Sequence, residues 1–279
     1  MNTALSIAGS DCSGGAGIQA DLKTMTLNGV YAMSAITALT AQNTTGVSEI
    51  TAVTPHFLRQ QLDMIFTDIF PDAVKIGMVP SAELMETVRE RLSFYQAKNI
   101  VVDPVMASTS GTDLMKKEAL SCLKASLLPM ARLITPNIPE AEALSGMKIE
   151  SRADMERAAA WMEKQWGCAV LLKGGHMAGR DTGQADDLLC AADTLSWFPA
   201  RHIPNPNTHG TGCTLSSAIA ANLAKGMELE QAVRQGKSYI TGAIAAGLNL
   251  GKGRGPLNHA FDLHSRFAET PASTKGETK

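Results

Sequence analysis

Short apolar runs typical of β-strands alternate with amphipathic helical segments along most of this 279-residue chain. The expected strands cover residues 4–8, 30–39, 73–76, 100–102, 133–135 and 169–172. The expected helices cover residues 18–27, 55–66, 82–94, 112–123, 139–144, 153–166, 213–225 and 229–248. Strands separated by helices usually pair in parallel, and a parallel sheet is covered by helices on both faces. The sequence therefore predicts an α/β fold with a mainly parallel central sheet.

The stretch between residues 186 and 203 departs from this alternation. Residues 188–190 and 195–198 are strand-like and flank an Ala-Ala-Asp turn, which predicts a small antiparallel portion of the sheet. Neither a linker nor an internal repeat interrupts the chain. We therefore expect one domain over residues 1–267, followed by a small, polar, disordered tail over residues 268–279.

Polar residues and glycines gather where the expected strands end. They occur at Gly9-Ser10-Asp11, Gln42-Asn43, Gly77-Met78, Asp103-Pro104, Pro136-Asn137 and Lys173-Gly174-Gly175. In open α/β sheets, ligands bind at the carboxyl ends of the strands. The sequence therefore predicts a ligand site along this edge of the sheet.

A glycine-rich turn, Gly210-Thr211-Gly212, precedes the helix that is expected to begin at Cys213. The first backbone N–H groups of a helix lack partners, and together with the helix dipole they attract anions. The same position can lower the pKa of a thiol. An anion site with a base beside it suits transfer of a phosphoryl group to an alcohol. The alternative interpretation is an ordinary glycine-rich turn with an unreactive cysteine.

Two carboxylates and a lysine follow other strands of the same expected edge. Asp103 and Glu140 are candidates to hold a hydrated Mg²⁺, which needs few direct carboxylate ligands. Lys173 follows a buried strand and precedes two glycines, a position suited to a phosphate. The alternative is structural, because Asn137 is a typical helix N-cap, Glu140 a typical first-turn acid and Asp103 a turn-former.

Other nucleotide motifs are weak or absent. Residues 15–20 match the G-x-G-x-x-G/A pattern of dinucleotide-binding folds, but no acidic residue follows at the required spacing before Glu49. No G-x-x-x-x-G-K-[ST] occurs, which excludes a Walker-type site. The neutral amides Gln42 and Asn43 are candidates to bond the polar edge of a ring, or alternatively to cap turns.

The composition argues against several classes of partner. A net charge of −2 without a long basic run gives no sign of nucleic acid or of a membrane surface. Residues 24–48 are uncharged but hold six threonines, two serines and three amides, too polar to cross a bilayer; they are interpreted as a helix end, a buried strand and a loop. Five scattered cysteines without a C-x-x-C pair favour a reducing, cytoplasmic location.

The motifs occur together in an order that resembles the hydroxymethylpyrimidine/phosphomethylpyrimidine kinases of the ribokinase-like superfamily. They are GSDCSGGAGIQADLK at 9–23, TALTAQNT at 37–44, VDPVM at 102–106, LITPN at 133–137, LKGGH at 172–176, NTHGTGCTLSS at 207–217 and GKGRGPLNH at 251–259. The resemblance implies ATP-dependent phosphorylation of 4-amino-5-hydroxymethyl-2-methylpyrimidine and then of its monophosphate, in thiamine biosynthesis. Related sugar kinases and many pyridoxal kinases carry Asp where this chain has Cys213, although some Cys-bearing relatives accept pyridoxal.

The resemblance also implies roles for individual residues. Cys213 would be the base, beside an anion hole formed by the N–H groups of Gly210, Thr211 and Gly212. The other implied roles are pyrimidine binding by Gln42 with Gly9, Ala16, Met78 and Val105, metal and phosphate binding by Asp103, Asn137, Glu140 and Lys173, and nucleotide contacts from Thr208 and Lys237. The expected cofactor is Mg²⁺ with ATP, and the expected assembly is a homodimer. A pyridoxal kinase, or a non-catalytic nucleotide- or pyrimidine-binding protein, is the alternative.

Overall fold

A single nine-stranded sheet runs through the molecule in the computed structural model, which describes residues 1–106, 117–175 and 184–268. The strand order is β3-β2-β1-β4-β5-β6-β7-β8-β9. The strands are β1 (Thr3–Asp11), β2 (Tyr31–Asn43), β3 (Gly46–Ala52), β4 (Ala73–Ile76), β5 (Ile100–Val102), β6 (Leu133–Ile134), β7 (Ala169–Leu172), β8 (Asp187–Ala191) and β9 (Thr194–Phe198). Strands β2, β1, β4, β5, β6 and β7 pair in parallel, which confirms the predicted mainly parallel sheet.

Both edges of the sheet are antiparallel. Strands β7, β8 and β9 form the hairpin expected near residues 186–203. At the other edge β2 turns back into β3, and this second hairpin was not predicted. The interpretation of residues after 39 as a loop is wrong, because β2 extends to Asn43. Most of the β3 side chains are exposed, so the sequence of this strand lacks the apolar alternation by which a strand is detected.

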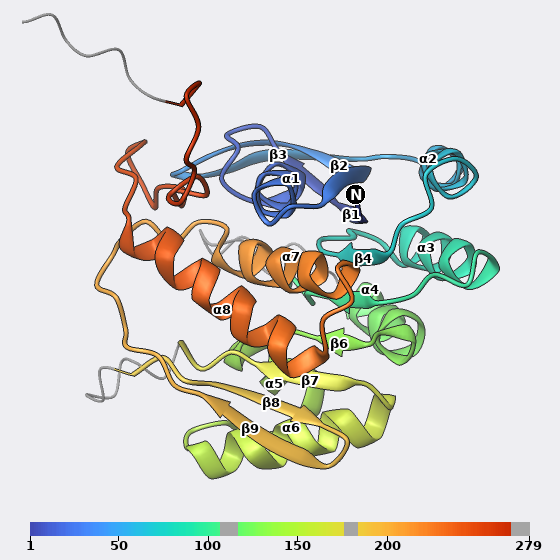
Figure 1. The fold of residues 1–279 in the computed structure, drawn as a ribbon. Coiled ribbons are helices and arrows are strands. Elements are labelled where there is room, and N and C mark those ends of the chain that lie inside the picture. Colours follow the sequence, from blue (N-terminus) through green and yellow to red (C-terminus); the bar gives the residue numbers. More distant parts are fainter. Residues whose placement is uncertain (107–116, 176–183, 269–279) are drawn as a thin grey trace, which may run out of the picture.

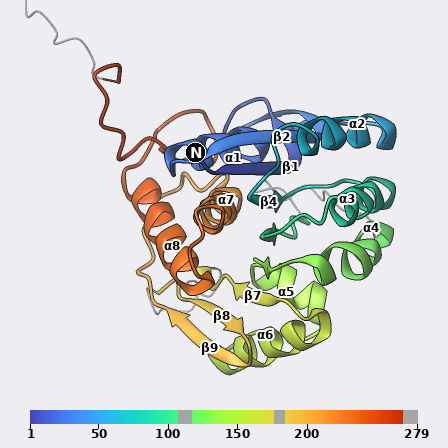
Figure 2. The same ribbon diagram turned by 45° about the vertical axis from the view of Figure 1, so that its right-hand side comes forward.

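Helices cover both faces of the sheet (Figures 1 and 2). One face packs against α1 (Gly17–Leu27), α7 (Thr211–Ala224) and α8 (Leu229–Ala245). The other packs against α2 (Pro55–Phe66), α3 (Ala82–Phe94), α4 (Lys117–Cys122), α5 (Ile138–Ser145) and α6 (Arg152–Trp166). Of the helix expected at 112–123, residues 112–116 lie outside the described residues, and after Cys122 the chain continues as a π-helical turn.

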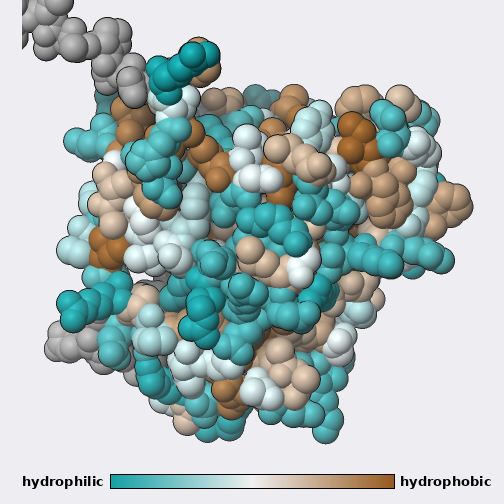
Figure 3. All heavy atoms as spheres, viewed as in Figure 1, coloured by the Kyte–Doolittle hydropathy of each residue, from teal (hydrophilic) through white to brown (hydrophobic). Residues whose placement is uncertain are grey.

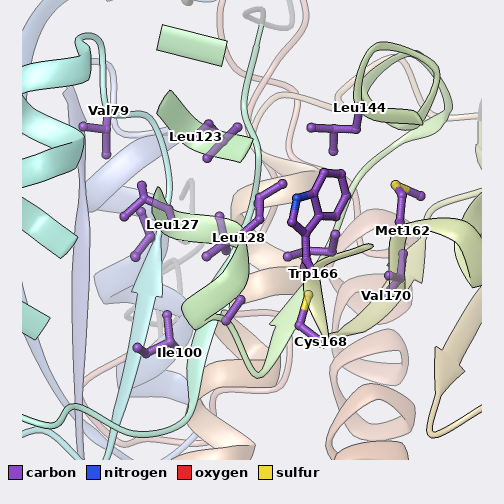
Figure 4. Close-up of a cluster of buried hydrophobic side chains, with 14 of the residues drawn as sticks. Val79, Ile100, Leu123, Leu127, Leu128, Leu144, Met162, Trp166, Cys168 and Val170 are labelled. Atoms are coloured by element: carbon purple, nitrogen blue, oxygen red, sulfur yellow. The ribbon is translucent and has the colours of Figure 1, made fainter. Parts of the chain in front are cut away.

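The larger apolar core lies between the sheet and α2–α6. Figure 4 shows part of it, where Trp166 from α6 lies beside Leu128, and Met162 from the same helix lies close to the strand residue Val170. On the opposite side α8 is amphipathic, with Ala232 and Val233 buried and polar residues facing outward. Hydrophilic residues accordingly cover much of that face (Figure 3). Among the described residues, no helix has both the length and the apolar character needed to cross a bilayer.

Local sequence signals explain where several helices begin and end. The Thr54 side chain accepts a hydrogen bond from the Phe57 N–H and Pro55 occupies the first turn of α2. Ser151 caps α6 in the same way, and Gly167 ends it in the left-handed region with φ 66°. Helix α7 begins at Thr211, two residues earlier than expected, which places Cys213 inside its first turn. The expected tail lies outside the described residues apart from Ala268.

Candidate active site

A cavity of about 650 Å³ opens along the carboxyl ends of the parallel strands. Its wall includes residues from β1, β2 and α7, together with the segments that follow β4, β5, β6 and β7. The residues that line it include Gly9, Ala16, Gln42, Met78, Asp103, Val105, Asn137, Glu140, Lys173, Thr208, Gly210, Thr211, Gly212, Cys213 and Lys237. The topology thus brings residues separated by more than two hundred positions into one chamber. Asn43, the other amide proposed to bond a ring, does not line the cavity; its side chain accepts from the Thr45 N–H and hydroxyl and caps a turn, which is the alternative that the sequence left open.

The glycine turn before α7 presses against the N-terminal glycine loop. Gly210 has φ 86°, and a Cβ on it would lie 2.0 Å from the Gly15 carbonyl oxygen. Only glycine therefore permits this approach. The Thr211 N–H donates to the Thr208 carbonyl at 3.3 Å, so this amide is already partly engaged. Gly212 and Cys213 follow in the first helical turn, where backbone N–H groups lack a helical partner.

Cys213 lies in the wall of the cavity and is partly exposed to it. Burial raises the pKa of its thiol to about 11, and the nearby Lys75 ammonium only partly opposes this shift. The expectation that the helix N-terminus would lower the thiol pKa is therefore wrong for the unliganded protein. Loss of hydration of the thiol outweighs the helix dipole.

A fully enclosed ion pair lies beneath Cys213. Lys75, in the middle of β4, donates to both carboxylate oxygens of Asp21 on α1 at 2.9 and 2.8 Å, and neither side chain is exposed. The hydroxyls of Ser6 and Ser217 donate to the same carboxylate at 2.5 and 2.7 Å. Lys75 sits in the apolar run Ala-Val-Lys-Ile, and a charged residue inside a buried strand was the signal that could have identified it.

A second lysine, Lys173, joins two carboxylates at the charged end of the cavity. This end comprises Asp103, Glu140, Lys173 and the first turn of α7. The Lys173 Nζ atom is 3.0 Å from Asp103 and 4.0 Å from Glu140. Burial pushes the pKa of Asp103 upward, but Lys173 and Lys75 reverse this and hold it below its ordinary value. Burial raises the pKa of Glu140 to about 7, and the Asp103 charge adds to that shift while Lys173 opposes it.

Glu140 also has the structural role that its position suggested. Its carboxylate accepts from the Asn137 N–H at 2.8 Å, and the Asn137 side chain accepts from the Glu140 N–H at 2.9 Å. The two residues form a capping box at the start of α5. The capping box turns both side chains to the cavity wall, so the structural and functional interpretations are compatible. Within the described residues, no three His, Cys, Asp or Glu side chains cluster closely enough to hold a metal by themselves.

The opposite, amide end of the cavity comprises Gly9–Asp11, Thr40, Gln42, Met78 and His209. A Cβ on Gly9 would lie 2.5 Å from the Met78 Cε atom, so the glycine makes room for the methionine. The Gln42 amide lies within 3.3 Å of Thr40 Oγ1 and 3.2 Å of His209 Nε2. His209 and Asp11, joined by a 2.8 Å contact, were not identified from the sequence as site residues.

Lys237 is less available than expected. Its Nζ atom lies 2.5 Å from Asp187 and 3.0 Å from the Ala185 carbonyl oxygen, so its charge is paired within the wall of the cavity. Asp187 in turn accepts from the Gly174 N–H at 2.9 Å. The lysine therefore helps to connect α8 to the loop after β7. Thr208 also lines the cavity, through the loop before α7.

Comparison with known proteins places these features in context. A family profile described as phosphomethylpyrimidine kinase matches residues 11–258. A hydroxymethylpyrimidine/phosphomethylpyrimidine kinase of Rhizobium meliloti is 48% identical over 259 residues, covering 92% of this chain and 96% of that one. The thiamine biosynthesis bifunctional protein of Geobacter sulfurreducens is 48% identical over 94% of this chain, which spans only 54% of its length.

Two solved structures are similar in fold as well as in sequence. The crystal structure of a phosphomethylpyrimidine kinase from Clostridium difficile has a TM-score of 0.78 at 46% identity, covering 88% of this chain and all of that one. The ADP complex of Bacillus subtilis pyridoxal kinase has a TM-score of 0.86 at 38% identity, covering 93% of this chain and 98% of that one.

Proposed function

Because the chain belongs to the phosphomethylpyrimidine kinase family, we propose that it phosphorylates 4-amino-5-hydroxymethyl-2-methylpyrimidine and then its monophosphate, in thiamine biosynthesis. The observation that carries the proposal is one cavity with two chemically different ends. The charged end places Cys213 and the first turn of α7 near Lys173, and the amide end offers the Gln42 amide and the Thr40 hydroxyl. The first suits a phosphoryl group and the second an uncharged polar ring.

In this proposal the amide end binds the pyrimidine. Gln42 bonds the polar edge of the ring, while Met78, Val105, Gly9 and Ala16 form the surrounding wall. A side-chain amide both donates and accepts, which matches an amino group beside a ring nitrogen. The ring's hydroxymethyl group would then extend toward Cys213.

Phosphoryl transfer requires the hydroxymethyl oxygen to lose its proton as it bonds to the γ-phosphorus of ATP. In the proposed step the Cys213 sulfur accepts that proton, the new P–O bond forms, and the bond from phosphorus to the leaving oxygen of ADP breaks. The N–H groups of Gly210, Thr211 and Gly212 would donate to the oxygens of the transferring group. The thiol must be ionised to act as a base, and the Lys75 ammonium beneath it favours the thiolate.

The charged end also fits a magnesium ion. Asp103 and Glu140 supply hard oxygen donors, and burial together with the Asp103 charge raises the pKa of Glu140 even though Lys173 opposes this. A divalent cation there would also oppose the rise, and bound Mg²⁺ neutralises developing phosphate charge. Asp103, Asn137 and Glu140 would hold the metal–nucleotide complex with Lys173 beside them. Thr208 and Lys237 are proposed as further nucleotide contacts.

The remaining parts of the proposal rest on the family resemblance. We propose a homodimer in the cytoplasm, with residues 1–267 acting as one kinase domain. Pyridoxal phosphorylation is the main alternative activity, because pyridoxal kinases are among the similar solved structures. A non-catalytic binding protein is less compatible with the site, since binding alone does not need a cysteine at the anion hole.

The decisive experiment is mass spectrometry of products formed from the pyrimidine alcohol and Mg·ATP, with pyridoxal in a parallel reaction. We expect the monophosphate to appear first and the diphosphate to follow. Phosphorylation of pyridoxal alone would favour the alternative kinase. Ligand binding without ATP consumption would identify a binding protein.

A further inference from the structure

The amide end contains a chain of hydrogen bonds that begins at Asp11. Its carboxylate accepts from the N–H groups of Ser13, Gly15 and Ala16, and from the Ser13 hydroxyl at 2.7 Å. Each of these partners is a donor, so the carboxyl group must be ionised. Burial alone would raise the pKa of Asp11, but the hydrogen bonds from His209 and Ser13 lower it overall. An ionised Asp11 requires a proton on any nitrogen that contacts it.

The next link is the buried His209, whose Nε2 atom lies 2.8 Å from Asp11 Oδ2. Because the carboxylate only accepts, Nε2 must carry the proton and donate it. The same nitrogen is therefore also a donor toward its other neighbour, Gln42. Nε2 carries a single proton, which Asp11 already accepts, so a second group that contacts Nε2 favourably must be an acceptor that shares this proton.

Gln42 meets this requirement in only one of its two amide orientations. With its nitrogen toward His209 Nε2, at 3.2 Å, two donors would face each other. On the other side Thr40 Oγ1 donates its single proton to the Ser10 carbonyl at 2.9 Å, so the amide atom near it must be a donor. Both neighbours are satisfied when the amide oxygen faces His209 and the amide nitrogen faces Thr40.

We propose that Asp11 and His209 are positioning residues that lock the Gln42 amide in this orientation, and that the locked amide selects the ring edge. Once His209 and Thr40 are satisfied, the amide retains one acceptor site and one donor proton. Those two groups match a ring that presents an amino donor beside a nitrogen acceptor. A 4-oxo pyrimidine presents the reverse pattern, a carbonyl acceptor beside an N–H donor.

The inference deepens the proposed function and rests on it, because the ring must also direct its hydroxymethyl group to Cys213. Because the hydroxymethyl group must point to Cys213, a 4-oxo ring cannot turn over to bring its donor and acceptor groups into the order that Gln42 requires. A rotating glutamine would accept either ring, whereas a locked glutamine accepts one. His209 would therefore control specificity without touching the reacting atoms.

The test compares kcat/KM for the 4-amino pyrimidine alcohol and its 4-oxo counterpart. Wild-type protein should strongly prefer the 4-amino ring. His209→Leu removes the donor, and His209→Asn is too short to place one at the position of Nε2. Both should reduce the preference for the 4-amino over the 4-oxo ring by roughly tenfold to a hundredfold. In wild-type protein the 4-oxo ring leaves a polar group unpaired, and in these variants the freed Gln42 amide can rotate to pair with it. His209→Gln can place an N–H near the same point and should restore part of the preference.

His259→Leu is the matched control. His259 is also buried and contacts Thr214 Oγ1 at 3.0 Å, but it does not line the cavity. Its loss should reduce thermal stability and leave the substrate preference unchanged. Only variants that fold can be tested. If the His209→Leu or the His209→Asn protein folds and keeps the wild-type preference for the 4-amino ring, the inference is overturned. If wild-type protein phosphorylates neither pyrimidine, the proposed function itself fails.

Discussion

Two lysine–aspartate pairs flank the start of α7, and they differ in what surrounds them. Lys75 and Asp21 are both wholly enclosed, with two serine hydroxyls completing the carboxylate's partners. Lys173 is 15% exposed at its side chain, faces the cavity and has a second carboxylate, Glu140, 4.0 Å away. Lys75 borders the cavity but its side chain is not exposed, whereas the Lys173 side chain is partly exposed to the cavity. Partners and exposure, and not residue type, therefore distinguish the enclosed pair from the pair that is proposed to bind phosphate.

Cys213 lies between the two pairs. Lys75 favours ionisation of its thiol, whereas Asp21 and Asp103, together with burial, oppose it. The Lys173 ammonium faces the same cavity. Changes at either pair should therefore alter the chemistry of the cysteine, but only changes at the enclosed pair should strongly affect folding.

The largest expected effect is on folding, from Lys75→Met. The substitution leaves Asp21 buried without its counter-ion, which should lower the free energy of unfolding by about 3–5 kcal/mol. Chemical denaturation measures this loss. The double variant Lys75→Met/Asp21→Leu removes both charges and should recover part of it. A loss below about 1 kcal/mol would mean that the pair is not a structural element.

The next effect is on catalysis, from Cys213→Ala. Loss of a positioned base should lower kcat by about 10²–10⁴-fold with little change in stability. A thiol pKa of about 11 means that the thiolate fraction grows throughout the neutral and alkaline range, so wild-type kcat should rise with pH to at least 9. Cys213→Asp should be more active than the alanine variant and should lack this alkaline rise. Wild-type turnover in Cys213→Ala would rule out the proposed base.

Lys173→Met tests the open pair directly. Removal of a cation beside the transferring phosphoryl group should lower kcat/KM by about 10²–10³-fold. The loss of stability should be smaller than for Lys75→Met, because Asp103 borders the cavity and keeps its hydrogen bond from Thr135. The two variants can be compared by denaturation under identical conditions. Equal losses of stability in Lys75→Met and Lys173→Met would show that the two pairs do not differ in their structural role.

Glu140→Gln should produce the smallest effect, and its sign depends on pH. The folded-state pKa of about 7 lies above the ordinary value of 4.5, so folding favours the protonated carboxyl; stability is lost as the pH rises from about 4.5 to 7, and the full penalty remains above pH 7. The neutral glutamine should therefore stabilise the unliganded protein at pH 8 by roughly 1–3 kcal/mol, and the gain should shrink as the pH falls toward 5. Activity should fall and partly recover at raised Mg²⁺.

Glu142→Gln on the same helix is the control for this measurement. The Ile149 N–H lowers the pKa of Glu142, so ionisation there favours folding and neutralisation should bring no gain. Thermal melts of both variants across pH 5–8 provide the comparison. A Glu140→Gln protein that is no more stable than wild type at pH 8 would contradict the raised pKa.

The open pair could be anticipated from the sequence. Of the enclosed pair, Lys75 could have been noticed as a charge in a buried strand, but its partner Asp21 could not. Asp103, Glu140 and Lys173 each follow a predicted strand, and parallel pairing brings strand ends to one edge. Lys75 meets Asp21 across 54 positions, inside the layer between sheet and helix. Short-range patterns carry no information on which side chains meet there.

Other differences between the sequence-based predictions and the structure have equally specific causes. The sequence placed Cys213 at a helix start correctly, but the sign of its pKa shift depends on burial, which only the folded chain determines. The link between Asp11 and His209 spans 198 positions and depends on close approach of two glycine loops. Strand β3 escaped notice because its side chains are mostly exposed and show no apolar alternation.

The contact between Ser217 and Asp21 joins positions that are 196 residues apart. On a ribosome, β1, α1 and β4 emerge long before α7, so Lys75 and Asp21 remain hydrated while most of the chain is being made. Helix α7 excludes that water when it docks, and its first turn is the proposed anion hole. Exclusion of water from the Lys75–Asp21 pair and completion of the site thus occur together, late in the synthesis of the chain. A chain released before α7 would have neither.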